Sequence, residues 1–197
     1  MRRLEPPLEP GRVYRTKELA AWARNPFALA MRLVDEGKLT RLGHGLYHHP
    51  AAGLLGPLPP SSEELVRAFL GGRRFVFTGT SMWNRLGLGT TQAMTVTLVY
   101  NTERSGRFTL GRRSFVFKRS RFPESPTAEW FAVDLLNNLA LVPDADPERN
   151  LTALRRRLAA DLDPGAFTAA LAAYGSRSAK ALVRRYHVLD DEAAPVA

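Results

Sequence analysis

Basic side chains and glycines gather in one short stretch of this sequence, residues 37–50, in a pattern suited to binding phosphates. Lys38, Arg41 and His44 follow one another closely there, and Gly43 and Gly45 flank the histidine. Cationic side chains on a glycine-containing turn can approach the backbone or the minor groove of a nucleic acid. The chemistry that these residues offer is electrostatic recognition of a polyanion.

The sequence contains no set of residues at a spacing that is typical of catalysis or metal binding. The histidines lack partners at a ligand-forming spacing, and neither a phosphate-cradling GxxxxGK[ST] loop nor a GxSxG elbow occurs. Glu129 and Asp134 have no lysine nearby, as a metal-dependent nuclease would require. The absence of cysteine excludes disulfides and thiolate metal sites. We therefore expect no enzymatic activity, no metal and no cofactor.

Two short helices and a hairpin must position the basic stretch. Thr16 can cap a first helix, and the pair Asn25 and Pro26 is typical of a point where one helix ends and the next begins. The second helix is expected to close at Gly37. Residues 38–42 and 46–48 then alternate as strands around a tight turn. This order predicts a winged helix-turn-helix, with residues 38–48 as its wing.

The second helix, residues 26–36, fits two helical phases. One buries the aliphatic side chains at Leu29, Ala30, Leu33 and Val34 and leaves Phe27, Ala28, Met31, Arg32 and Asp35 outward. The other turns Phe27, Ala30, Met31 and Val34 inward. We prefer the first phase, because it buries two leucines at a spacing of four. In that phase Phe27 and Met31 would touch thymine methyl groups or mark a protein interface.

The positive charge of the chain is unevenly distributed. The formal charge is +9, made up of +4 in residues 1–50, +5 in residues 51–140 and none in residues 141–197. A polyanion would therefore meet the first two thirds of the chain through a salt-sensitive attraction. A GC-rich genome, which favours arginine, is an equally good explanation of the total charge but a weaker one of its clustering.

A second basic segment follows in the middle of the chain. Gly111 and Arg112 have the spacing of a two-residue hairpin turn between residues 107–110 and 113–118. Such a hairpin could bind phosphates, offer a cationic face to an acidic partner, or carry its charges only as protection against aggregation. Its basic residues are Arg104, Arg107, Arg112, Arg113, Lys118, Arg119 and Arg121.

The overall pattern predicts an α+β fold, with an N-terminal winged helix-turn-helix, a mixed domain with a mainly antiparallel sheet, and C-terminal helices. The expected division is residues 1–50 for the winged helix, 51–60 for a Pro/Gly-rich linker, 61–189 for the mixed domain and 190–197 for a frayed tail. No apolar run approaches a membrane span, and the N-terminal residues lack the apolar core of a signal peptide. We expect a cytoplasmic protein.

Three segments of the chain resemble the AbiEi-type antitoxins. They are the stretch from Val13 through GKLTRLGHGLYHHP at 37–50, LLGPLPP at 54–60, and LGLGTTQ at 86–92. The positions that match the family are Leu33, Val34, Gly37, Leu39, Arg41, Gly45, Tyr47 and Pro50. One departure is residues 1–12, where three prolines and a glycine oppose the helix that relatives have. A second is that Phe27 and Met31 stand where relatives tend to be polar.

The resemblance implies a transcriptional regulator of a type IV toxin-antitoxin, or abortive infection, operon. Its N-terminal domain would bind operator repeats in double-stranded DNA and repress its own operon. The rest of the chain would counteract a nucleotidyltransferase toxin, directly or indirectly. The residues expected to contact DNA are Thr16, Lys17, Arg24, Asn25, Ala28, Arg32, Lys38, Arg41 and His44. The alternative is a protein-interaction module whose winged helix no longer binds DNA, and a nucleic-acid-processing enzyme ranks last.

Overall fold

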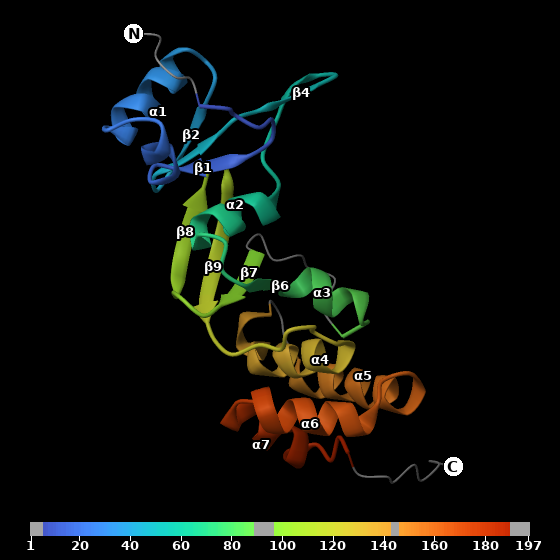
Figure 1. Ribbon diagram of the computed structural model, residues 1–197. Coiled ribbons are helices and arrows are strands. Elements are labelled where there is room, and N and C mark those ends of the chain that lie inside the picture. The colour runs from blue at the N-terminus through green and yellow to red at the C-terminus, as the bar shows by residue number, and fades with distance from the viewer. Residues whose placement is uncertain (1–5, 89–96, 143–145, 190–197) are drawn as a thin grey trace. The chain divides into compact units, whose positions relative to one another are not determined.

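The structure is a computed structural model that describes residues 6–88, 97–142 and 146–189. Figure 1 traces the chain from the N-terminus to the C-terminus. The chain divides into two compact units. Unit 1 contains the chain up to residue 75 together with residues 101–119, and unit 2 contains residues 76–100 and the chain from residue 120 onward.

Unit 1 begins with a small antiparallel sheet and a helix packed on it. The sheet has the order β1-β3-β2, with Tyr14 opposite Tyr47 and Arg41 also opposite Tyr47. The core between helix and sheet contains both tyrosines, Leu29 and Leu33. The elements, in chain order, are β1 (Val13–Arg15), the 3-10 helix η1 (Glu18–Ala21), α1 (Pro26–Asp35), β2 (Thr40–Gly43) and β3 (Leu46–His48).

The expected helix cap at Thr16 is wrong. The first helix is only the 3-10 turn η1, and it begins after Lys17 without a side-chain cap. The Thr16 hydroxyl instead donates a hydrogen bond to the carbonyl of Gly45 at 3.1 Å. A threonine hydroxyl can bond to backbone groups other than the amides of a following helix, and here its partner is the Gly45 carbonyl in the β2–β3 turn.

Residues 51–60, expected as a linker, contain a second antiparallel hairpin. Strands β4 (Ala51–Gly53) and β5 (Gly56–Leu58) pair with Ala51 opposite Leu58. Gly56 has a φ of 118°, which L-amino acids rarely adopt, and this allows the sharp reversal. Leu54 and Leu55 at the tip are fully exposed. The sequence-based domain boundaries at residues 50 and 60 stay a prediction.

Helix α2 (Ser62–Leu70) and the hairpin formed by β8 (Gly106–Leu110) and β9 (Arg113–Arg119) complete unit 1. The predicted two-residue turn of the hairpin is confirmed, since Leu110 pairs with Arg113 and Gly111 has a φ of 62°. Aromatic rings join helix and hairpin, with the ring centre of Phe69 at 4.9 Å from that of Phe108 and 5.1 Å from that of Phe117. A segment distant in sequence thereby belongs to the N-terminal unit.

Unit 2 contains two strands and a set of helices. Asp134 on α4 is buried, and its carboxylate accepts hydrogen bonds from the Trp83 indole and the Asn138 amide at 2.9 Å and from the Thr78 hydroxyl. The elements are β6 (Phe75–Thr78), α3 (Thr80–Arg85), β7 (Thr97–Asn101), α4 (Ala128–Asn137), the 3-10 turn η2 (Leu139–Leu141), α5 (Pro147–Ala160), α6 (Pro164–Tyr174) and α7 (Arg177–Arg185).

The apolar core of unit 2 lies between helices. Leucines and valines of α4, α5, α6 and α7 bury one continuous cluster that includes Trp83 and Phe167. The three predicted C-terminal helices are confirmed, as is the mixed α+β class with antiparallel sheets. The winged-helix assignment of residues 1–50 stays a prediction. The predicted tail, residues 190–197, lies outside the described residues. The β-branched residues of 94–100 also predict a strand, and its first residues, 94–96, lie outside the described residues as well.

Candidate nucleic-acid interface

Helix α1 begins at Asn25 as the sequence predicts. The side-chain oxygen of Asn25 accepts a hydrogen bond from the Ala28 amide at 3.0 Å, and Pro26 occupies the first turn. This cap satisfies one of the amide groups that a helix leaves unpaired at its start. The same oxygen is therefore engaged in the helix, and only the amide nitrogen of Asn25 is left to read a base.

The preferred phase of α1 is confirmed. Leu29, Ala30 and Leu33 are buried in the core of unit 1, whereas the Phe27 side chain is 54% exposed. Ala28 is exposed as well, while Met31 and Arg32 are half-buried. The outward face of α1 is therefore a mixture of a large apolar ring, a small apolar residue and a cation.

Two of the expected DNA contacts, Arg32 and Lys38, converge on Glu36. The Arg32 guanidinium lies 2.6 Å from one carboxylate oxygen of Glu36, and the Lys38 ammonium lies 3.1 Å from the other. The hydrogen bond from Lys38, aided by Arg32, holds the pKa of Glu36 below its ordinary value. Sequence reasoning overlooked this carboxylate, although Arg32 and Glu36 have the i,i+4 spacing at which helical ion pairs form. Glu36 competes with a phosphate for both cations.

The turn between β2 and β3 runs through the left-handed backbone region. Gly43, His44 and Gly45 have φ values of 91°, 52° and 70°. The hydrogen bond from Thr16 to Gly45 joins the segment between β1 and η1 to this turn. His44 is exposed, yet its ring contacts the edges of Phe69 and Phe108, with ring centres 5.8 and 5.7 Å apart. These aromatic contacts hold the His44 ring against α2 and β8.

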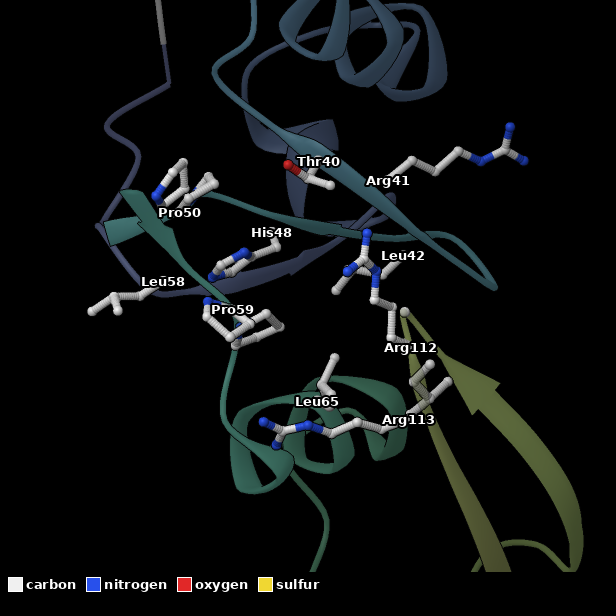
Figure 2. A pocket seen from close by; sticks show the side chains of 14 residues that line it. Thr40, Arg41, Leu42, His48, Pro50, Leu58, Pro59, Leu65, Arg112 and Arg113 are labelled. Atoms are coloured by element: carbon white, nitrogen blue, oxygen red, sulfur yellow. The ribbon is translucent and has the colours of Figure 1, made fainter. Parts of the chain in front are cut away.

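The structure leaves six of the nine expected DNA contacts exposed. Arg41 extends from β2 away from the neighbouring side chains in Figure 2. An exposed cation without a fixed partner can follow a phosphate backbone at little conformational cost. Two of the exposed residues, Asn25 and His44, make the side-chain contacts described above. The other exposed members of the expected set are Lys17, Arg24, Ala28 and Arg41.

The residues of the basic hairpin differ in their exposure and in their contacts. The Arg104 guanidinium lies 4.6 Å above the centre of the Phe69 ring, and Arg113 donates a hydrogen bond to the Ser62 hydroxyl at 2.7 Å. Arg107 and Arg119 are exposed, and Lys118 is half-buried. Arg121 belongs to unit 2, whereas the other six belong to unit 1. The role of these basic residues towards a phosphate or an acidic partner stays a prediction.

His48, which precedes His49 at the end of β3, is buried and is not a surface cation of the β2–β3 hairpin. Its side chain is 2% exposed, and burial, with a smaller effect from His49, lowers the pKa of His48. The Nε2 atom of His48 has no hydrogen-bond partner. A buried polar atom without a partner is uncommon and calls for an explanation. No pattern in the sequence distinguishes this histidine from the exposed His44.

His48 lines a pocket of about 430 Å³ within unit 1. Figure 2 shows the pocket between β2, the segment following β5, α2 and the tip of the β8–β9 hairpin. Its apolar lining includes Leu42, Pro59, Leu65 and Leu110. Arg112 and Arg113, from the hairpin tip, also line it. Sequence reasoning missed this pocket, because its lining combines residues of the segment 40–65 with residues 110–113, which are distant in the chain.

The structure offers no candidate metal site in the residues that it describes, since nowhere among them do three histidine or acidic side chains gather. Within the same residues, no helix is both long enough and apolar enough to cross a lipid bilayer.

A family model matches residues 23–129, which is more than half of the chain, and its description is a family of unknown function (DUF6088). The chain belongs to this family. The match to the DUF6088 family spans α1, both hairpins that follow it, α2 and the β8–β9 hairpin. The family region therefore contains the candidate interface from Arg24 onward and the pocket.

Comparison with curated protein sequences gives no match. Among solved structures, this DUF6088 family member is similar to the crystal structure of the RV2827C protein from Mycobacterium tuberculosis. The TM-score is 0.55 at 14% identity, and the likeness covers 91% of this chain and 72% of the other. At such an identity the likeness concerns the fold alone, and it agrees with the mixed α+β class.

Proposed function

We propose that this chain is a DNA-binding autorepressor and the antitoxin of a type IV toxin-antitoxin operon. In this proposal residues 13–50 act as a winged helix that lacks the usual first helix, with α1 as the recognition helix and the β2–β3 hairpin as the wing. The remaining chain counteracts a nucleotidyltransferase-type toxin. The DNA-binding half rests on geometry, and the antitoxin half rests on the resemblance to AbiEi-type antitoxins.

One observation carries the DNA-binding half: α1 buries its leucines and leaves Ala28 outward, while Arg24 and Arg41 are exposed cations on the segments before and after it. A recognition helix needs a small or polar outward face that enters the major groove, and its neighbours must supply cations for the phosphates. In this arrangement Ala28 approaches a thymine methyl group, and Arg32 contacts a base edge or phosphate once it leaves Glu36.

Fluorescence anisotropy with a duplex from the promoter of the chain's own operon tests this half over a series of salt concentrations. We expect Arg41→Ala to weaken binding about tenfold and to lower the salt dependence by about one released counterion. Arg155→Ala is the matched control, because Arg155 is an exposed arginine on α5 in unit 2. Absence of binding at low salt, or equal effects of the two substitutions, would overturn the proposal.

Co-expression with the product of the adjacent gene tests the antitoxin half. We expect that product to arrest growth by itself and this chain to restore growth. The Arg41→Ala variant should restore growth equally well if the toxin is counteracted through unit 2 and not by repression. A neighbouring product without toxicity would end the antitoxin assignment, whereas DNA binding would stand on its own measurement.

A second candidate function is a protein-interaction module that no longer binds DNA. The observation in its favour is the exposure of Phe27 on α1, together with the fully exposed Leu54 and Leu55 at the tip of the β4–β5 hairpin. Large apolar side chains in contact with water often mark protein interfaces. Association with a protein partner that is insensitive to salt and is lost in Phe27→Ser would favour this alternative.

A further inference from the structure

We propose that the unit 1 pocket binds a small planar organic acid, a ligand with an apolar ring, one ring N–H or O–H group, and a carboxylate. The apolar walls would enclose the ring, His48 would pair with the polar hydrogen, and the arginines of the β8–β9 turn would hold the carboxylate. The pocket shares β2 and Arg41 with the proposed DNA-binding surface, but the inference does not depend on DNA binding.

The size and lining of the pocket fit such a ligand. At about 430 Å³ it lies within the range of small-molecule sites, which combine apolar walls with a few polar groups. Leu42, Leu65 and Leu110 supply apolar walls from a strand, a helix and a hairpin, and Pro59 adds a rigid one. Rigid and largely apolar walls favour a flat ring over a flexible polar chain.

His48 supplies the polar group inside the pocket. Its side chain is almost fully buried, and Nε2 has no partner in the protein. Figure 2 shows the ring of His48 extending from β3 into the space beside Pro59. A neutral imidazole can accept a hydrogen bond at the ring nitrogen that carries no proton. A ligand that donates to Nε2 would satisfy an atom that the fold leaves unpaired, and this would contribute both affinity and orientation.

The arginines at the pocket determine the charge of the ligand. Arg112 is exposed at the hairpin tip, and Arg113 is held by Ser62 at 2.7 Å. In Figure 2 both side chains lie beside the pocket, and Arg41, which also lines it, extends its side chain away from theirs. No acidic residue is among those that line this pocket. An anionic group is therefore favoured at the arginine end, where bidentate hydrogen bonding to a carboxylate is available.

The pocket lies where the tip of the β8–β9 hairpin contacts β2. The Gly111 amide at the hairpin tip donates a hydrogen bond to the Leu42 carbonyl on β2 at 2.9 Å, so one wall is tied to the strand that carries Arg41. A ligand between these two segments would stabilise their contact. Binding should therefore raise the melting temperature of the full chain as well as give a calorimetric signal.

Isothermal titration calorimetry of the full-length protein with indole-3-acetate tests the proposal. Two analogues separate the contacts: 1-methylindole-3-acetate lacks the N–H group that would meet His48, and indole-3-acetamide lacks the charge that would meet the arginines. We expect saturable binding of indole-3-acetate at micromolar to millimolar concentrations and about tenfold weaker binding of each analogue.

Matched arginine variants complete the experiment. Arg112→Ala should weaken indole-3-acetate about tenfold and leave the neutral amide almost unchanged, whereas Arg107→Ala, on the same hairpin but outside the pocket, should change neither. His48→Gln, which keeps a polar side chain, should remove the preference for the N–H analogue over the N-methyl one. The proposal is overturned if indole-3-acetate does not saturate, or if Arg112→Ala and Arg107→Ala have equal effects.

Discussion

Units 1 and 2 place their polar groups differently. In unit 2, the carboxylate of Asp134 is buried and accepts hydrogen bonds from the side chains of Thr78, Trp83 and Asn138. In unit 1, the corresponding polar groups remain accessible or unpaired: Arg41 is exposed, and His48 Nε2 has no partner. A satisfied buried network fixes packing, whereas available charges and unpaired atoms are suited to a partner. Among its described residues, unit 2 also holds two unpaired buried atoms, Asn150 Nδ2 and Arg157 Nε, but the exposed cations and the pocket of our two proposals belong to unit 1.

The largest expected effect is in unit 2. Asp134→Ala leaves the Trp83 indole, the Asn138 amide and the Thr78 hydroxyl without their acceptor in the core, and we expect the free energy of unfolding to fall by roughly 3–5 kcal/mol. Urea denaturation followed by circular dichroism measures this loss. Asp161→Ala removes an exposed ion pair with Arg157 and should cost less than about 1 kcal/mol. Similar losses for the two variants would contradict a structural role of Asp134.

A smaller effect is expected at the start of α1 in unit 1. Asn25→Ala removes the side-chain cap of the Ala28 amide and should lower the free energy of unfolding by about 1 kcal/mol. Because the same helix faces DNA in our proposal, affinity for the promoter should fall as well. Asn25→Ser restores a cap but not an amide, so it should recover stability without full affinity. Full recovery of affinity would show that Asn25 acts only through the helix.

The pH dependence of unit 1 should carry a contribution from His48. Burial lowers the pKa of His48 below its ordinary value of 6.5, so the unfolded chain takes up the proton before the folded chain does. Stability should be greatest above pH 6.5, decline as the pH falls below that value, and level off below the folded pKa. Urea unfolding at a series of pH values measures this slope, which His48→Gln should reduce. An unchanged slope in that variant, with a reduced one in His44→Gln, would contradict the assignment.

The smallest expected effect is an increase in DNA affinity. Glu36→Gln weakens the hold on Arg32 and Lys38 and removes a negative charge beside the candidate interface, so promoter binding should strengthen by a few-fold at low salt. Glu63→Gln is the matched control, because Glu63 pairs with Arg67 at the same i,i+4 spacing on α2. Weaker binding in Glu36→Gln would mean that Arg32 and Lys38 must be held by Glu36 to contact DNA.

Local elements of the candidate site were predictable from sequence because short-range rules determine them. The cap at Asn25, the phase of α1 and the two-residue turn at Gly111 all follow from side-chain chemistry within a few residues. Arg32 was correctly placed on the outward side of its helix, yet its pairing with Glu36 was overlooked although the spacing was visible. Thr16 was assigned a cap, because sequence alone did not show that its hydroxyl bonds to the Gly45 carbonyl.

By itself, the sequence determined the mixed α+β class, the helix α1, the β2–β3 and β8–β9 hairpins, and a positive charge confined to the first two thirds of the chain. Only the tertiary structure decided that His48 is buried while His44 is exposed, and that the β8–β9 hairpin belongs to the N-terminal unit. It also decided that His48 and the tip of this hairpin line one pocket. The physical reason is that hydrophobic periodicity and capping act over a few residues, whereas burial depends on contacts between segments far apart in the chain.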